Sequence, residues 1–266
     1  MSRSMSSTAR PASTVPTSPS SEHNHEDPTI EFTNTQDLFQ VINCISGDFL
    51  IVTHVSPSDF AEIEEERVIR RRKYRWRRYH AESRILVVAI PTGVHETLHL
   101  LLYEKYRDQL CGSGIQKAWT SIGDSGEGDS TGGPKPQCVW PTLVIQAGDS
   151  ESLNQLRMDM QWWFAASNHD VKIVILAKFD RGQSRVILEK WEEAAATSAA
   201  LQPVLQQTIT ISRNQATNPV SYDVTRGALV LEFRLLFLRD PGLGQGDFII
   251  SIPDLQEYAE AVWARV

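Results

Sequence analysis

Apolar and polar positions along residues 140–178 follow a pattern that predicts a strand, a helix and a second strand in succession. Residues 143–145 form a short apolar run after a proline, as in a strand that is buried on both faces. A Gly-Asp-Ser break follows, and apolar residues then recur at helical spacing over residues 153–164. Residues 171–176 (VKIVIL) have the pattern of another buried strand. Two such strands joined by one helix are expected to lie parallel in one sheet, with a right-handed crossover between them.

The rest of the chain shows the same two periodicities and predicts an α/β fold. We expect a short helix or turn over residues 37–45, helices over 61–72, 92–110 and from residue 253 onward, and strands over 48–53, 73–78, 84–90, 185–192, 205–213, 228–238 and 248–252. The Ala-rich residues 193–201 fit either helix or coil. The Gly- and Ser-rich connection 111–139 is long enough to be either a functional loop or a mobile one. The expected fold is therefore a mixed sheet with a central β-α-β crossover, flanked by helices.

Composition divides the chain into three parts. Residues 1–33 are rich in Ser, Thr and Pro and have few large apolar side chains. Such a segment cannot bury enough surface to offset the entropy lost on ordering, so a disordered tail is predicted. Residues 34–72 are expected to form an N-terminal extension of helix and strand, and residues 73–266 the main α/β domain.

Charge and cysteine content limit the partners and the cellular compartment that are expected for the protein. The net charge of −7 argues against a surface that coats nucleic acid non-specifically, but it leaves room for a local basic patch. The three cysteines share no metal-ligand spacing, as expected of free thiols in a reducing compartment. No run of about 18 apolar residues occurs, so no membrane partner is expected. No apolar segment of the secretory kind follows the N-terminus, so we expect an intracellular protein, cytoplasmic or nuclear.

The string WPTLVIQAGDSESLNQLRMDMQWWF, followed by VKIVIL, resembles a group of fungal proteins with a restriction-endonuclease-like core of the PD-(D/E)XK nuclease superfamily. The resemblance runs from about Lys73 to the C-terminus, and it implies a restriction-endonuclease-like sheet. It also implies hydrolysis of phosphodiesters with a divalent metal. In that chemistry an Asp and a Glu hold the ion, often Mg²⁺, and a Lys positions the attacking water and stabilises developing charge.

The resemblance places the catalytic positions on specific residues, and two of them depart from the pattern. The Asp position falls on Asp129, with Gly128 where a proline is expected. The Glu position falls on Gln146 and the Lys position on Gly148, while Asp159 stands near the place where some relatives carry a migrated lysine. An amide oxygen is a neutral and weaker ligand than a carboxylate, so the affinity for a dication falls. The resemblance therefore implies a nuclease fold with lost or severely reduced activity.

Other residues could restore the missing chemistry if the protein is an active nuclease. Glu96 is a candidate metal ligand beside Asp129, as in some relatives, and Lys172 is a candidate catalytic cation. Asp149 or Glu151 could supply the absent carboxylate. The expected cofactor is accordingly either none or Mg²⁺.

A basic stretch, RRRKYRWRRYH, covers residues 70–80 and alternates with period 2. One interpretation is a surface strand that contacts the phosphates of a nucleic acid. The other is a half-buried strand whose arginine stems lie along apolar surface. The candidate nucleic-acid-binding residues are Arg71, Arg72, Lys73, Arg75, Arg77 and Arg78.

The predicted helix 92–110 contains His95-Glu96-Thr97-Leu98-His99, which matches H-E-x-x-H. Two histidines four residues apart share one helical face and can bind zinc, while the glutamate polarises a water. A zinc site needs a third protein ligand, and no downstream motif supplies one. Histidines with a purely structural role are the alternative.

Three functions therefore remain open. The first is a degenerate nuclease-fold domain that acts as an interaction module for nucleic acid or protein. The second is an active nuclease that depends on a divalent metal, and the third is a zinc hydrolase.

Overall fold

The computed structural model describes residues 27–70, 74–121, 128–136, 139–195 and 201–266. Most of the predicted disordered tail, residues 1–26, lies outside the described residues. The remainder does not fit that prediction, because Thr29–Glu31 forms a strand, β1, that pairs with β2 (Phe49–Thr53).

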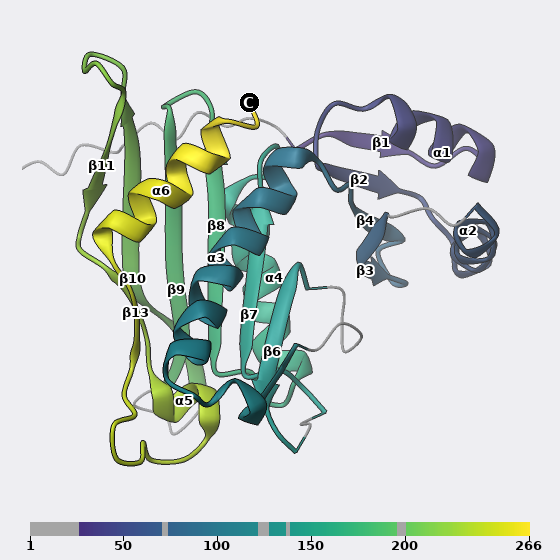
Figure 1. Ribbon diagram of the computed structural model, residues 1–266. Coiled ribbons are helices and arrows are strands. Elements are labelled where there is room, and N and C mark those ends of the chain that lie inside the picture. The colour runs from purple at the N-terminus through teal and green to yellow at the C-terminus, as the bar shows by residue number, and fades with distance from the viewer. Residues whose placement is uncertain (1–26, 71–73, 122–127, 137–138, 196–200) are drawn as a thin grey trace, which may run out of the picture.

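The larger part of the molecule is built on a seven-stranded mixed sheet in the order β11-β10-β9-β8-β7-β6-β5 (Figure 1). Its strands are β5 (Trp119–Ser121), β6 (Ser130–Pro134), β7 (Leu143–Gly148), β8 (Ile173–Asp180), β9 (Arg185–Ala195), β10 (Leu201–Asn214) and β11 (Ser221–Thr225). β7 and β8 are parallel and are joined by α4 (Leu153–Ala166), which confirms the predicted crossover. All other neighbouring strands in this sheet are antiparallel. The mixed α/β architecture expected from the sequence is therefore present.

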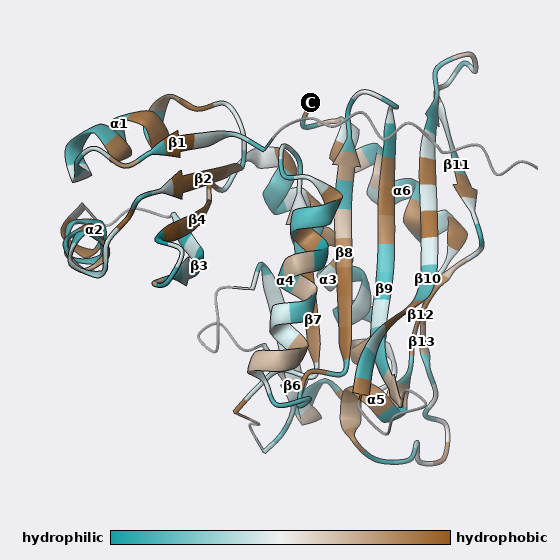
Figure 2. Cartoon of the chain, turned by 180° about the vertical axis from the view of Figure 1, so that it is seen from behind, coloured by the Kyte–Doolittle hydropathy of each residue, from teal (hydrophilic) through white to brown (hydrophobic). Residues whose placement is uncertain are grey.

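Helices cover both faces of this sheet because side chains alternate between the faces along each strand. Leu143 and Ile145 pack with α3 (Gly93–Gly112) and α6 (Ile252–Trp263), whereas Val144 packs with α4 on the opposite face. The central strands β7 and β8 are mostly apolar along their length, as strands covered on both faces must be (Figure 2). None of the helices in the described residues combines the length and the apolar character needed to cross a bilayer.

A smaller four-stranded sheet lies beside the large one, in the order β1-β2-β4-β3 (Figure 1). It contains β3 (Arg75–His80) and β4 (Ile85–Ala89) and packs with α1 (Thr35–Cys44) and α2 (Pro57–Arg70) around its own apolar core. β3 and β4 belong to the same sheet as β1 and β2. The domain boundary expected at residue 73 therefore falls inside this unit.

A β-bulge in β3 determines which side chains of the small sheet point toward the large sheet. Trp76 pairs with Val88 and Arg78 pairs with Val87, so Arg77 is an extra residue without a partner on β4. A bulge re-aims the side chain of the inserted residue. Trp76, Arg77 and Arg78 are consequently all buried, and the strict alternation predicted for this strand is wrong.

Two further segments differ from the predicted elements. The connection 111–139 contains a 3-10 turn, η1 (Gln116–Ala118), and the strands β5 and β6, where only a loop was expected. The predicted strand 228–238 is a short strand, β12 (Leu229–Leu231), followed by a helix, α5 (Phe233–Phe237). β12 pairs with β13 (Phe248–Ile250) in a separate two-stranded sheet.

Candidate functional site

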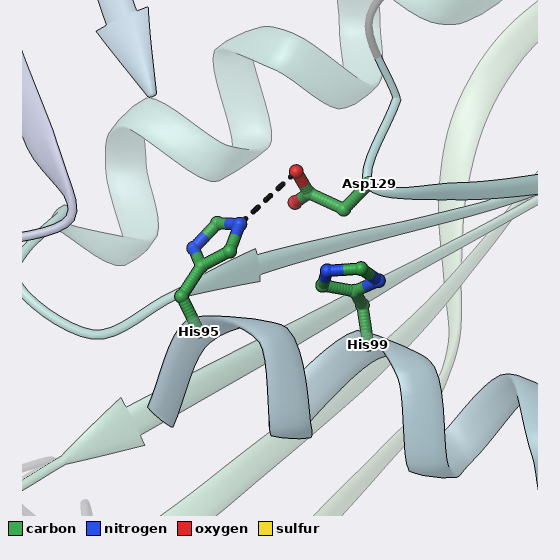
Figure 3. A group of neighbouring side chains, drawn as sticks. All are labelled: His95, His99 and Asp129. Atoms are coloured by element: carbon green, nitrogen blue, oxygen red, sulfur yellow. Dashed lines mark ion pairs between the residues drawn. The ribbon is translucent and has the colours of Figure 1, made fainter. Parts of the chain in front are cut away.

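The polar centre of the molecule lies where the carboxyl end of β7 meets α3, the start of α4 and the bulged strand β3. Asp129 reaches it from the residue before β6, and His95 and His99 reach it from α3 (Figure 3). Buried polar and charged side chains from both sheets meet here, although each alone is unfavourable in an apolar interior. The ion pairs among them explain how they are accommodated.

Arg77 is the central cation of this site. Its Nη1 donates to Glu151 Oε2 at 2.5 Å and to Asp159 Oδ2 at 3.1 Å, and its Nη2 donates to Asp129 Oδ2 at 3.2 Å and to the carbonyl of Ala147 at 2.7 Å. Its side chain is 3% exposed. Burial alone would lower the pKa of Arg77, but attraction to Glu151, Asp129 and Asp159 outweighs burial and raises it. The guanidinium is therefore a permanent internal charge that joins three carboxylates.

Asp129 contacts four partners through its two oxygens. Its Oδ1 accepts from Arg75 Nη1 at 2.9 Å and lies 3.1 Å from His95 Nε2, while its Oδ2 accepts from Arg77 and from the backbone N–H of Ala147 at 2.7 Å. Burial opposes ionisation, but the charges of His95 and Arg77 lower the pKa of Asp129 well below its usual value. Asp129 therefore lies at the carboxyl end of β7, bonded to the residue that follows Gln146.

His95 lies between two carboxylates. Its Nδ1 is 2.8 Å from Asp48 Oδ2, and its Nε2 faces Asp129. Burial would lower the pKa of His95, but the two acids, Asp129 first, raise it to about 9. Asp48 also accepts from the backbone N–H groups of Asp149 and Ser150, each at 2.7 Å. Nothing in the local sequence marks Asp48 as part of the site, because these partners lie 47 to 102 residues away.

His99 occupies the next turn of α3. Its Nδ1 is 2.8 Å from Ser130 Oγ, and its Nε2 is 3.4 Å from Glu96 Oε1. Glu96 also accepts from Arg75 Nη2 at 3.1 Å, and its side chain is one-third exposed. The nearby His99 ring, acting against partial burial, lowers the pKa of Glu96. Glu96 therefore lies at the solvent edge of a site whose histidines are internal.

Gln146 is buried at the carboxyl end of β7, and its Oε1 has no hydrogen-bond partner in the described part of the chain. It lines a cavity of about 10 Å³, which has room for roughly one water. The other lining residues are Arg77, Arg78, Asp159, Trp162 and Trp163. Two positions along, a Cβ on Gly148 would approach Leu156 Cδ1 to 3.1 Å and Glu151 Cβ to 3.3 Å. A side chain at the position where the resemblance expects a lysine would therefore require Leu156 and Glu151 to shift.

Lys172 is not part of the site. It precedes β8, and Gln146 pairs with Leu176, so about four residues of strand, or about 13 Å, separate the two. The lysine near the site is Lys178, whose Nζ donates to the carbonyl of Asp149. Burial lowers the pKa of Lys178. Its position is readable from the sequence only once the parallel register of β7 and β8 is known.

The two acids considered as substitute ligands already have cations of their own. Asp149 binds Arg181 through two hydrogen bonds, of 2.8 and 2.6 Å. Glu151 binds Arg77, and burial raises the pKa of Glu151 well above its usual value. Neither acid is left as a free carboxylate beside Gln146.

Within the basic stretch, the arginines of β3 face inward. Arg75 and Arg77 bind the acids described above, and Arg78 binds Asp159 Oδ1 through Nε at 2.8 Å and Gln155 through Nη2 at 3.2 Å. An exposed phosphate-binding surface is therefore the wrong interpretation for Arg77 and Arg78, and Arg75 is exposed only at its edge. The other three candidates, Arg71, Arg72 and Lys73, lie outside the described residues.

Comparison with models of protein families, with curated proteins and with solved structures finds no match to this chain. Functional conclusions therefore depend on the side chains themselves. The site brings together Asp129, Gln146 and Glu96 from the predicted set, together with both histidines. Glu151 and Asp159, which the sequence had also singled out, lie in the site as well. The site adds Asp48 and Lys178, and it leaves out Lys172.

Proposed function

We propose that this chain is a restriction-endonuclease-like domain that lacks nuclease activity and acts as an interaction module for proteins. The resemblance around residues 140–176, the parallel crossover and the helices on both faces of the sheet support this fold. The observation that carries the proposal is the position of Arg77. Its guanidinium lies among the carboxylates that a catalytic dication would need.

Charge and geometry both oppose a hard cation at this position. Mg²⁺ requires near-octahedral oxygen ligands, usually with one or two carboxylates. Asp129 Oδ2, the oxygen that faces β7, already accepts from Arg77 and from Ala147 N. Gln146 offers only a neutral oxygen, and a dication beside it would be repelled by the fixed charge of Arg77. The space at Gly148 leaves no place for a catalytic lysine without displacing Leu156.

The first test is cleavage of plasmid and single-stranded DNA by the full-length protein with Mg²⁺ or Mn²⁺. We expect no cleavage above the background of a mock purification. The variant Gln146→Glu is expected to remain inactive as well, because Arg77 keeps its place and no lysine is present. A commercial nuclease in the same buffer serves as the positive control. Metal-dependent cleavage that Asp129→Ala abolishes would overturn the proposal in favour of an active nuclease.

A second test separates protein partners from nucleic acid. Because Arg75, Arg77 and Arg78 bind internal acids, and the net charge is −7, we expect no measurable affinity for duplex or single-stranded oligonucleotides. Fluorescence anisotropy at about 50 and 200 mM salt measures this, since phosphate contacts weaken steeply over that range. Tight binding that weakens with salt would show that the partner is a nucleic acid.

The alternative of a zinc hydrolase gains a third metal ligand but lacks an accessible place for a substrate. Asp129 supplies the third ligand that the sequence motif alone does not provide, since His95, His99 and Asp129 each offer one ligand atom within 4.8 Å of the others. Both histidines are only 1% exposed, however, so a substrate has little access to their ring nitrogens. The arrangement supports metal binding better than it supports catalysis.

A further inference from the structure

We propose that His95, His99 and Asp129 form a closed zinc-binding site, in which Asp48 orients His95 from behind. The inference goes beyond the proposed function and does not depend on it. The proposed zinc site lies on the side of Asp129 that faces away from the nuclease-like positions Gln146 and Gly148. The metal has a structural role there, as a link between α3 and the segment that leads into β6.

The ligand atoms already converge. His95 and His99 are four residues apart on α3, so their rings lie on the same face of the helix, and Asp129 approaches them from the neighbouring segment (Figure 3). Nε2 of His95 and Oδ1 of Asp129 are 3.1 Å apart. Zinc bonds of about 2.0–2.2 Å in a tetrahedral arrangement place neighbouring ligand atoms roughly 3.4 Å apart. With all three atoms within 4.8 Å of one another, small side-chain adjustments complete the geometry.

Hydrogen bonds fix which nitrogen of each histidine faces the metal. Nδ1 of His95 is bonded to Asp48 and Nδ1 of His99 to Ser130 Oγ, so in each ring Nε2 remains as the ligand atom. A metal-bound histidine usually donates its other N–H to a carboxylate or another oxygen in this way. Nε2 of His99 is buried and makes no hydrogen bond of good geometry to any described residue, which is the condition of a ligand atom. Glu96 Oε1 lies 3.4 Å from this atom, at the solvent edge of the site and outside the group of three ligands.

The two oxygens of Asp129 separate this site from the nuclease-like one. Oδ2 faces Arg77 and Ala147, whereas Oδ1 faces His95 and Arg75. Imidazole nitrogens with a carboxylate suit zinc, whereas Mg²⁺ prefers an all-oxygen set. Zinc binding here is therefore compatible with the absence of a Mg²⁺ site beside Gln146.

The experiment uses the full-length chain purified without a histidine tag, stripped with a chelator and reconstituted with zinc. We expect one zinc per chain by elemental analysis and a Tm that rises with the zinc concentration. Cobalt in place of zinc is expected to give the visible absorption of a tetrahedral ion. The variant His99→Gln is expected to lose stoichiometric zinc, and Asp48→Asn to bind it about 10–100-fold more weakly.

A matched control is His169→Gln, which alters a histidine that pairs with Glu193 outside the site and is expected to bind zinc as the parent does. Circular dichroism confirms that each variant is folded. If a variant does not fold, the cobalt spectrum of the parent decides the matter. Absence of zinc and of a tetrahedral cobalt spectrum in the parent, or zinc binding unchanged in a folded His99→Gln variant, overturns the site. Neither result alters the expected lack of Mg²⁺-dependent cleavage, so the two proposals fail separately.

Discussion

Replacement of Arg77 by methionine is expected to destabilise the fold by about 3–5 kcal/mol. The change keeps a long side chain but removes the cation from three buried carboxylates, those of Asp129, Glu151 and Asp159. Removing one partner of a buried ion pair leaves uncompensated charge, which is worse than never having had the pair. The free energy of unfolding in urea at pH 7, on metal-free protein, measures the effect. Arg77→Lys is expected to give an intermediate loss, since one nitrogen replaces the two that Arg77 uses.

Arg234→Met is the matched control for this substitution. Arg234 also forms an ion pair, with Asp240, but both side chains are more than 70% exposed. An exposed pair of this kind contributes little, so a change below about 0.5 kcal/mol is expected. If Arg77→Met and Arg234→Met proved equally mild, Arg77 would not be the internal cation on which the proposed function depends.

The stability of the metal-free protein is expected to fall as the pH rises from about 6.5 to about 9. The folded pKa of His95 is about 9, above the value of 6.5 for an unperturbed histidine. The folded state therefore binds the proton more tightly than the unfolded chain does. This contribution is present in full below pH 6.5 and is lost as the pH passes through the folded pKa. At about 1.4 kcal/mol per pH unit, the loss is on the order of 3 kcal/mol.

Urea unfolding in a chelator-containing buffer at several values across this range tests the expectation. His95→Gln is expected to be less stable at pH 6.5 and to show a flatter profile, because it has no proton to lose. Glu151, whose pKa burial raises, contributes in the same direction, so the difference between parent and variant isolates His95. A profile equally steep in both proteins would show that His95 does not carry the charge between Asp48 and Asp129.

The central crossover could be predicted because its pattern is local. Residues 143–145 and 171–176 are apolar on both faces, and a helix of clear periodicity separates them. The strand predicted over residues 228–238 was wrong because a short apolar run does not reveal its own period. Phe233, Leu236 and Phe237 face the core together because they are three and four residues apart on α5.

Contacts between residues far apart in the chain determine the features that the sequence pattern did not predict. β6 was missed because Ser130–Pro134 reads as a turn, yet Gly132 is required there, since a Cβ would lie 2.5 Å from Trp119 Nε1 and from Tyr103 Oη. The inward path of Arg77 depends on a bulge that shifts the register of β3 by one residue. A strand prediction that assumes strict alternation cannot include that shift. The histidine motif, by contrast, was visible in the sequence, and only its third partner required the fold.

The ion pairs of Arg77 also have a consequence for folding during synthesis on the ribosome. The four strands of the small sheet are complete once residue 89 has been synthesised. The acids that neutralise Arg77 follow it by 52, 74 and 82 residues. At about 5–20 residues per second, a ribosome needs several seconds to supply them all. Until then Arg77 lacks both its counter-ions and the elements that bury it in the folded chain, so we expect β3 to settle into its final arrangement only after α4 has left the exit tunnel.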